Sequence, residues 1–249
     1  MKTLFSALLA LLLMAPLASA QEAGMTPDGM TGAQKTEIEK IVHDYLLKNP
    51  EVIREAIQAL QAKEEQSKAD AQTELVARNK DALFNDPASP VDGNPMGDVT
   101  VVEFFDYRCP YCKAVAAPLQ KLIEEDKGVR LVMKEFPILG QDSILASQAA
   151  LASVGQGKYW EFHQALMEHK GQFDMEVIKG IAAKVGLDPA KLEADMQGDK
   201  IKPAISANHA LAKTLDIGAT PTFIIGDQVV EGAVPLEQLK ELIKKARGS

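Results

Sequence analysis

Apolar residues recur with helical spacing near the start of the chain. In residues 36–48 they fall three or four positions apart and so share one helix face: Ile38, Ile41, Val42, Tyr45 and Leu46. The dipeptide Asn49-Pro50 then predicts the end of this helix and the start of another, with Asn49 as N-cap and Pro50 in the first turn. We therefore expect two consecutive helices.

The second predicted helix extends to about Phe84 and changes character along its length. Its first part has an apolar face up to Leu60, whereas alanine is the only apolar residue type over 61–74. A helix that is polar all round crosses solvent or separates modules. The pattern predicts a helical stalk over 34–84 whose apolar residues at 36–60 are covered by other copies of the chain. The alternative is that residues 36–60 fold back onto the main domain.

The rest of the chain alternates strands and helices. Residues 85–98 are rich in Pro, Gly and Asp and predict a boundary, with the main domain over 85–249. We expect a buried strand in "VTVVEFFDY", a helix in "CPYCKAVAAPLQKLIEEDK", and a second strand in "VRLVMKEFP". A helical block follows at about 142–216, and then two short strands and a last helix. This order predicts an α/β fold in which a helical block separates a β-α-β unit from a β-β-α unit.

The first twenty residues have the layout of a secretory signal peptide. Lys2 precedes an apolar run from Leu4 to Leu17, and Ala18-Ser19-Ala20 forms an A-x-A cleavage site. The run is shorter than the roughly 20 residues that span a bilayer, which disfavours a membrane anchor. We predict cleavage after Ala20, export of the mature chain, and a flexible lead-in over residues 21–33.

Charge and cysteine content narrow the classes of function. The formal net charge is −8, and loss of Lys2 with the signal peptide would make it −9 (−8 − 1). An acidic chain without a long basic run argues against nucleic acid as a partner. Two cysteines in a mature chain of 229 residues (249 − 20) do not make a disulfide framework, because a domain of this length buries an adequate core without one.

The two cysteines stand where the first strand gives way to a helix. Cys109 is thereby predicted to lie near unpaired backbone N–H groups and the positive end of the helix dipole, which favour the thiolate. Pro110 suits the first helical turn, and Cys112 lies one turn on, near enough to form a disulfide with Cys109. This arrangement predicts a redox-active pair that needs no cofactor, because the dithiol is itself the redox group.

Other uses of the two thiols are weaker. A structural zinc site needs four ligands, and the chain has no third cysteine and scattered histidines at 43, 163, 169 and 209. His163 and His169 are six residues apart and are interpreted as surface or rim residues, so no metal site is predicted. Binding of Cu(I) by the two thiolates stays an alternative. A purely structural disulfide over one helical turn would add little stability.

Two further residues are candidates for the site. Pro221 in "GATPTFIIG" stands at the start of a predicted strand, where a cis bond would leave the backbone of Thr220 free to pair with an extended substrate. Glu103 lies in the middle of the buried first strand, where a carboxyl group has a raised pKa and can move protons. Lys134, central in the next strand, is a hypothetical partner for Glu103.

The sequence also resembles a known family. "EFFDYRCPYCK", the helical block and "GATPTFIIG" are similar to the DsbA family of periplasmic thiol:disulfide oxidoreductases, over about residues 86–245. "HDYLLKNPEVIREA" resembles the ScsC and Com1-like subgroup, which has N-terminal oligomerisation helices. The resemblance implies a thioredoxin-like fold with an inserted helical domain, preceded by a helical stalk.

The resemblance also implies roles for the site residues. Cys109 would be the nucleophile, Cys112 the resolving thiol, Pro221 the cis-proline and Glu103 the acid beneath the pair. Pro110, Tyr111 and Thr220 would contact the substrate. DsbA has His at the position of Tyr111 and Val at that of Thr220, whereas disulfide isomerases of the DsbC type have Thr before the cis-proline. These departures argue against a strongly oxidising role.

We therefore expect a periplasmic disulfide isomerase with some oxidase activity. It would form a dimer or trimer, because several catalytic domains facing one cleft hold a substrate longer. Its partners would be unfolded or wrongly disulfide-bonded exported proteins and a membrane redox partner. The alternatives are a DsbA-type dithiol oxidase, a copper-binding periplasmic protein that uses the same cysteines, and a holdase that grips unfolded chains without redox chemistry.

Overall fold

A computed structural model describes residues 29–248 of the chain. The predicted signal peptide and the predicted lead-in up to residue 28 lie outside the described residues. The contacts divide the chain into two compact units, one that ends at Ala62 and one that begins at Lys63.

The first unit holds helix α1 (Gly32–Lys48) and the start of α2 (Glu51–Arg78). A capping box formed by Thr31 and Gln34 starts α1 at Gly32, so the helix begins inside the predicted lead-in. Asn49 ends α1 rather than capping α2, because its backbone N–H and its side-chain amide both donate to the carbonyl of Tyr45, each at 2.9 Å. No residue of α1 is buried.

The predicted single helix over residues 50–84 is broken at Asn79, between α2 and α3 (Lys80–Phe84). The side-chain amide of Asn79 donates to the carbonyl of Leu75 at 2.8 Å, which ends α2. Val76 and Leu83 on either side of the break are fully buried in the core of the second unit. The compact unit therefore takes in the last part of the segment that the sequence predicts as stalk.

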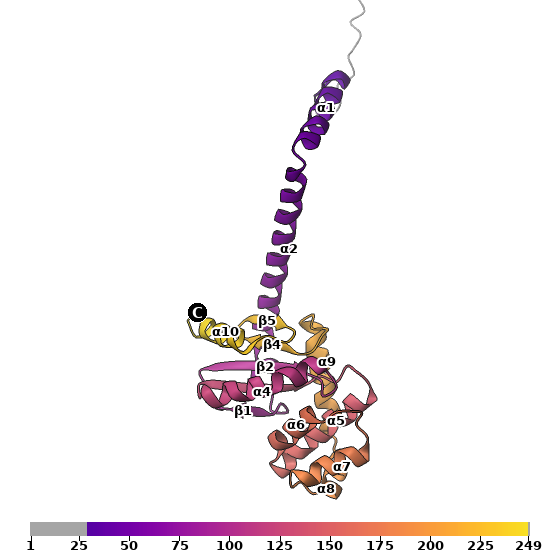
Figure 1. Cartoon of the computed structure of the whole chain (residues 1–249), viewed down its shortest axis with the longest axis vertical. Helices are drawn as coiled ribbons and strands as arrows, with labels where there is room; N and C mark the ends of the chain where they lie inside the picture. The colour runs from indigo at the N-terminus through magenta and orange to yellow at the C-terminus, as the bar shows by residue number, and fades with distance from the viewer. Residues whose placement is uncertain (1–28, 249) are drawn as a thin grey trace, which may run out of the picture. The chain divides into compact units, whose positions relative to one another are not determined.

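A five-stranded sheet forms the centre of the second unit (Figure 1). Its order is β1-β3-β2-β4-β5, with β2 parallel to β3 and the other neighbours antiparallel. The strands are β1 (Val91–Gly93), β2 (Val99–Phe105), β3 (Val129–Glu135), β4 (Thr222–Ile225) and β5 (Gln228–Glu231). Strand β1 was not predicted, because only three residues of a Pro- and Gly-rich segment pair with the edge of β3.

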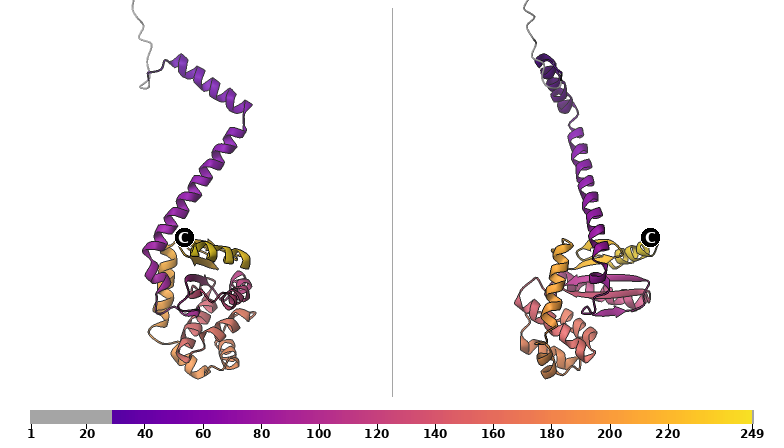
Figure 2. Two further views of the ribbon diagram at one scale, coloured as in Figure 1. Left: turned by 90° about the vertical axis from the view of Figure 1, so that its left-hand side faces the viewer. Right: turned by 180° about the vertical axis from the view of Figure 1, so that it is seen from behind.

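Helices cover both faces of the sheet. Helix α4 (Pro110–Glu125), which continues through Pro118, and α10 (Leu236–Arg247) lie on one face. The other face is covered by the C-terminal end of α2 together with α3 and α9 (Ile201–Thr214). The turned views in Figure 2 show α9 and α4 on opposite sides of the sheet. Residues of β2 alternate between the two cores, with Val101 and Phe105 on the α4 side and Val102 and Phe104 on the α9 side.

The predicted helical block connects β3 to β4. Its helices are α5 (Gln141–Ser153), a 3₁₀ turn (Val154–Gln156), α6 (Tyr159–Glu168), α7 (Met175–Lys184), α8 (Pro189–Asp195) and α9. The predicted breaks near residues 155–157, 186–189 and 197–198 are confirmed. A further break at residues 169–174 was missed, because this segment contains one glycine and no proline.

Candidate active site

Cys109 is the N-cap residue of α4. The strand β2 ends at Phe105 and the helix begins at Pro110, so the predicted strand–helix junction is confirmed. Cys109 has an extended backbone (φ −70°, ψ 118°), and its N–H donates to the carbonyl of Asp106 at 3.1 Å. The first N–H groups of α4 have no acceptor within the helix, so Cys109 lies at the positive end of the helix dipole.

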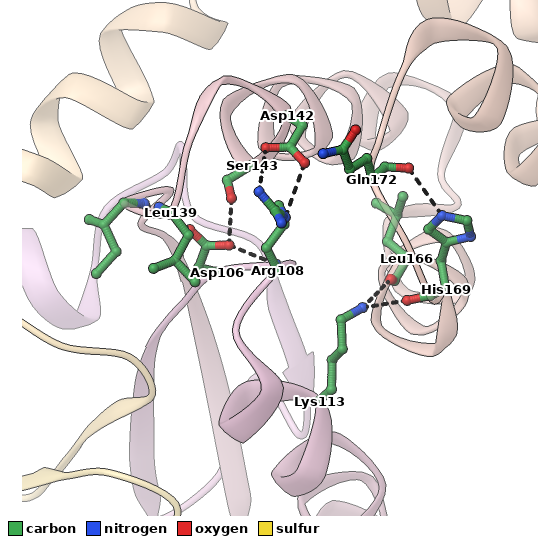
Figure 3. Close-up of polar contacts among 10 residues, drawn as sticks. Asp106, Arg108, Lys113, Leu139, Asp142, Ser143, Leu166, His169 and Gln172 are labelled. Carbon is green, nitrogen blue, oxygen red and sulfur yellow. Dashed lines mark hydrogen bonds and ion pairs between the residues drawn. The ribbon is translucent and has the colours of Figure 1, made fainter.

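The carboxylate of Asp106 fixes the loop that carries Cys109 (Figure 3). It is fully buried and accepts four hydrogen bonds of 2.7–2.9 Å, from the backbone N–H groups of Arg108, Ile138 and Leu139 and from the hydroxyl of Ser143. These donors belong to the loops after β2 and β3 and to α5. Sequence reasoning missed Asp106, although an acid directly after a buried strand was the available signal.

Lys113, in the first turn of α4, attaches this helix to the helical block (Figure 3). Its ammonium donates to three backbone carbonyls at the end of α6, at 2.7–3.2 Å: Leu166, Met167 and His169. The guanidinium of Arg108 forms an ion pair with Asp142 of α5 at 3.0 Å. The segment with the cysteines is thus tied on both sides to the inserted helices.

The thiol of Cys109 meets the loop before β4. Its Sγ donates to the carbonyl oxygen of Thr220 at 3.1 Å, and the Thr220–Pro221 peptide bond is cis. Strand β4 begins one residue later at Thr222. Pro221 is therefore both cis and placed just before a strand, as the sequence predicts. The carbonyl of Thr220, expected to be free for a substrate, accepts the hydrogen bond of Cys109 in this structure.

Cys112 lies deeper than Cys109, and both thiols are free. Burial raises the pKa of the Cys112 thiol far above its usual value, and the nearby charge of Glu103 raises it further. A backbone hydrogen bond from Asp106 and the side chain of Thr220 act in the opposite direction and lower this pKa by less. Cys112 therefore loses its proton only if a nearby base accepts it.

Glu103 is buried in β2, as predicted. It points to the α4 side of the sheet, because it alternates with Val102 and Phe104, which face α9. Burial, and to a smaller extent the charge of Glu135, raise its pKa to about 8. Its electrostatic coupling to Cys112 supports the predicted position beneath the cysteine pair.

Lys134 is not the partner of Glu103, which corrects the hypothesis from the sequence. In the parallel register Lys134 lies opposite Phe104, so its side chain points to the other face of the sheet. There its ammonium donates to the carbonyl of Ala82 at 2.7 Å, to Asp86 at 2.9 Å and to the hydroxyl of Ser89 at 2.7 Å. All three donor hydrogens of Lys134 are thus used to hold the segment after α3.

A group of buried polar side chains lies next to Glu103 and was missed by sequence reasoning. Glu135 accepts hydrogen bonds from the hydroxyls of Tyr107 at 3.0 Å and Tyr159 at 2.9 Å. His163, predicted to lie at the surface, is instead 3% exposed and contacts the Tyr107 hydroxyl through Nδ1 at 3.0 Å. Aromatic rings surround its imidazole, and Trp160 stacks on it, so the core environment is apolar.

The surface around Cys109 is partly apolar. Tyr111 is 66% exposed, and Ile138 and Leu139 of the loop after β3 are also exposed. Pro110 is exposed beside Cys109, whereas Thr220 is 9% exposed and contributes mainly its backbone. These residues can contact an extended apolar segment that approaches the thiol.

Over residues 29–248, no three or more His, Cys, Asp or Glu side chains gather in a way that could hold a metal ion. In the same part of the chain, none of the helices combines the length and the apolar character needed to cross a bilayer.

A five-stranded sheet with a cysteine pair at the start of a helix, opposite a cis-proline, defines the thioredoxin-like class of protein. Residues 100–244 match the DSBA-like thioredoxin domain, and the chain belongs to this family. It is a thiol-disulfide oxidoreductase of the DsbA and ScsC type. Residues 34–66 match a second family, described as the copper resistance protein ScsC N-terminal domain.

Solved structures and a curated relative agree with this family. A thioredoxin-like oxidoreductase from Silicibacter pomeroyi is 47% identical and covers 69% of this chain and 99% of its own, with a TM-score of 0.67. ScsC of Proteus mirabilis in a transitional conformation is 33% identical and covers 88% of this chain and 99% of its own, with a TM-score of 0.66. Disulfide bond formation protein D of Bacillus subtilis is 27% identical over 183 residues, which are 68% of this chain and 82% of that protein.

Other curated relatives are much longer proteins. A Na(+)/H(+) antiporter, NhaA 1 of Salinispora arenicola, is 27% identical over 158 residues, and this chain spans only 24% of its length. The similarity covers 63% of the present chain.

Proposed function

We propose that this protein is a periplasmic, oligomeric disulfide isomerase with some oxidase activity. Cys109 is the nucleophile and Cys112 the resolving thiol. Pro221 shapes the wall opposite Cys109, and Thr220 contributes the backbone to which an extended substrate can pair. The observation that carries the chemistry is the position of Cys109. Its sulfur lies at the start of α4 and 3.1 Å from the carbonyl oxygen of Thr220.

The exchange proceeds in two steps that balance. The Cys109 thiolate attacks a substrate disulfide, forming one S–S bond and releasing one substrate thiolate, which takes a proton from solvent. The Cys112 thiol then loses its proton to Glu103 and attacks the Cys109 sulfur, which releases the second substrate thiolate and oxidises the pair. In isomerisation a substrate thiolate instead attacks the mixed disulfide, so that Cys109 is regenerated and no net electrons are transferred.

The apolar residues of α1 and early α2 support self-association. On a single chain, large apolar side chains of this region are 47–70% exposed: Ile38, Ile41, Val42, Tyr45, Leu47, Ile53, Ile57 and Leu60. Exposed apolar surface of this extent marks an interaction site. A dimer or trimer formed here would bring several copies of Cys109 to one bound substrate, which suits isomerisation.

The remaining features of the proposal concern compartment and partners. Export through the predicted signal peptide would bring the mature chain to the periplasm, where a disulfide can persist. Its substrates would be exported proteins that are unfolded or carry wrong disulfides. A membrane redox partner would keep the pair in its working redox state.

Reactivation of a scrambled-disulfide substrate tests this proposal. The mature chain is compared with a variant that carries Ile41→Asp and Tyr45→Asp, and a Lys35→Glu variant is the control at an exposed polar position of the same helix. We expect the double variant to become monomeric and to lose most isomerase activity while it keeps dithiol oxidation. Equal, weak isomerase and strong oxidase activity in all three would indicate a DsbA-type oxidase.

Cu(I) binding by the same two cysteines is the second candidate function. It is favoured by the match of residues 34–66 to the family described as the copper resistance protein ScsC N-terminal domain. Two thiolates suit Cu(I), but the raised pKa of Cys112 works against the second thiolate. Stoichiometric Cu(I) binding that suppresses disulfide exchange at equal concentrations would support this function over the isomerase.

A further inference from the structure

Glu135 is a second buried carboxyl group on the α4 side of the sheet. Its Oε1 accepts both tyrosine hydroxyls, whereas its Oε2 is buried without a hydrogen-bond partner among residues 29–248. The hydroxyl oxygen of Ser147 is also buried without a hydrogen-bond partner in the same part of the chain, and Ser147 lies near enough to Glu135 to lower the pKa of that carboxyl. A buried carboxyl oxygen in this position is one that can carry the proton of the neutral acid.

Glu135 and Glu103 lie on the same face of adjacent parallel strands. In the register Glu103 lies opposite Met133, and Glu135 is two residues further along β3. Burial raises the pKa of each carboxyl to about 8. The charge of Glu135 adds to this effect at Glu103, so the two carboxyl groups are close enough to interact electrostatically. The two groups therefore hold protons that are exchanged close to neutral pH.

Tyr107 connects Glu135 to His163. The Tyr107 hydroxyl has one hydrogen and donates it to Glu135, so its oxygen accepts the hydrogen bond from His163 and Nδ1 of the imidazole carries a hydrogen. Burial lowers the pKa of His163 to about 3, so its ring is neutral and Nε2 can accept a proton. In this series of hydrogen bonds His163 donates to Tyr107, and Tyr107 donates to Glu135.

His163 also lines a surface groove between α4 and α6. The groove has a volume of about 510 Å³ and includes Lys113, Trp160, Gln164 and Met167. His163 is only 3% exposed, so it is the residue at which the hydrogen-bonded side chains reach the wall of the groove. These side chains thus run from the buried carboxyl of Glu135 through Tyr107 to that wall.

We propose that Glu135, Tyr107 and His163 form a proton conduit that links Glu103, beneath Cys112, to the groove between α4 and α6. The proposal rests on the proposed exchange chemistry and deepens it. It lets the proton of Cys112 leave or return while a bound substrate covers Cys109.

The proton steps balance in both directions. When the Cys109–Cys112 disulfide is reduced, Cys112 leaves as a thiolate and takes a proton from Glu103. Glu103 then takes a proton from Glu135, and Glu135 takes one from the Tyr107 hydroxyl. Tyr107 takes a proton from Nδ1 of His163, and Nε2 of His163 accepts a proton from water. Resolution of a mixed disulfide runs the same path outward, with Glu103 as the first acceptor.

Several titratable groups face the carboxyl pair and share its electrostatic environment. Asp106, Tyr107, Tyr159 and Cys112 interact with at least one of the two carboxyl groups. Cys109, Lys113 and His163 act one step further away, on Cys112, on Asp106 and Cys112, and on Tyr107 respectively.

Tyr107→Phe and Tyr159→Phe form a matched pair for the test. Each removes one hydroxyl that donates to Glu135, but only the Tyr107 hydroxyl also forms a hydrogen bond with His163, whereas Tyr159 stacks its ring on that imidazole. The reduced mature protein is mixed with oxidised glutathione and quenched with acid, and the glutathione adduct is counted by mass spectrometry. Formation of the adduct reports on Cys109, and its decay reports on Cys112.

The wild-type decay rate is expected to rise with pH through about 8, where the carboxyl pair loses its protons. Tyr107→Phe and Glu135→Gln should slow the decay about tenfold or more, with adduct formation unchanged. Tyr159→Phe should keep the wild-type maximum rate and only move the pH midpoint upward, because one hydrogen bond to Glu135 is lost.

The conduit would be overturned if the adduct in both Tyr107→Phe and Glu135→Gln decayed at the wild-type rate with the wild-type pH profile. It would also be overturned if Tyr159→Phe slowed the decay as much as Tyr107→Phe does. Failure of the wild-type protein to form any adduct would overturn the proposed exchange and the conduit with it.

Discussion

The thiol of Cys109 donates a hydrogen bond to the carbonyl oxygen of Thr220, 3.1 Å away and 111 residues further along the chain. The side chain of Thr220 also interacts with Cys112 and lowers the pKa of that thiol, against the larger effect of burial. Thr220 therefore acts on both cysteines, on Cys109 through its backbone carbonyl and on Cys112 through its side chain. The two effects can be separated by mutation.

Thr220→Val should slow the step performed by Cys112. The substitution keeps the carbonyl that accepts the Cys109 hydrogen bond but removes the hydroxyl, so the pKa of Cys112 rises further above its usual value. We expect the glutathione adduct to decay about threefold to tenfold more slowly, as for loss of one hydrogen bond to a charged group. Thr222→Val, which removes a nearby hydroxyl that bonds to Ala219, is the control. A faster decay in Thr220→Val would contradict this assignment.

Serine at either cysteine should separate the two chemical roles. Cys112→Ser should accumulate a stable mixed disulfide with substrate, because the resolving thiol is absent. Cys109→Ser should show no disulfide exchange above the uncatalysed rate, since the remaining thiol is buried and its pKa is raised. Non-reducing electrophoresis with a disulfide-bonded peptide distinguishes the two. Full activity of Cys109→Ser in preventing aggregation of unfolded proteins would favour a holdase.

Lys134→Met should destabilise the second unit by about 3 kcal/mol, the cost of leaving buried polar partners unpaired. The Lys134 ammonium satisfies Ala82, Asp86 and Ser89, and its side chain is 1% exposed. Urea denaturation measures the difference, with Lys80→Met as the control because Lys80 is exposed on α3.

The ion pair between Lys134 and Asp86 also predicts that the stability of the fold depends on pH. Burial alone would raise the pKa of Asp86, but the hydrogen bonds from Lys134 and Ser89 lower it below 3.8 overall. The stability from this pair is therefore present above pH 3.8 and is lost as the pH falls through the lowered value. Lys134→Met should lose this part of the acid dependence.

Glu103→Gln should stabilise the fold at high pH. The pKa of Glu103 is about 8 in the folded protein, against 4.5 as the ordinary value, so between these pH values the unfolded chain ionises while the folded chain keeps its proton. Stability therefore falls as the pH rises from 4.5 to 8. We expect a gain of roughly 2–4 kcal/mol at pH 8 and little change at pH 4.5. Urea denaturation at both pH values measures it, with the exposed Glu168→Gln as the control.

The chemical centre of the site could be predicted because its signals are local in sequence. Cys109 follows a buried strand and precedes a proline-started helix, and Pro221 precedes a short apolar strand. Such junctions depend on hydrophobic period and backbone chemistry, both of which are visible in a single chain. Glu103 was found for the same reason, as an acid inside a strand that is buried on both faces.

The polar residues around Glu103 could not be found in this way. Glu135 ends strand β3, Tyr107 follows β2, and Tyr159 and His163 lie on α6, so they meet only after the helical block packs on the sheet. Tyr159, Trp160, Leu166 and Met167 lie three or four positions from His163, and this apolar face was the signal that His163 is buried. The face to which Lys134 points depends on the register between β2 and β3, which single-sequence patterns leave open.

The contacts of Lys134 set a limit on where the N-terminal helices of this protein can be exchanged for others. Ala82, Asp86 and Ser89 are bound by a lysine in the middle of β3, and Val76 and Leu83 fill the same face. A fusion joined within residues 85–98 would separate this lysine from one or more of its partners. A replacement of the N-terminal helices is therefore best joined upstream of Val76, within the polar part of α2.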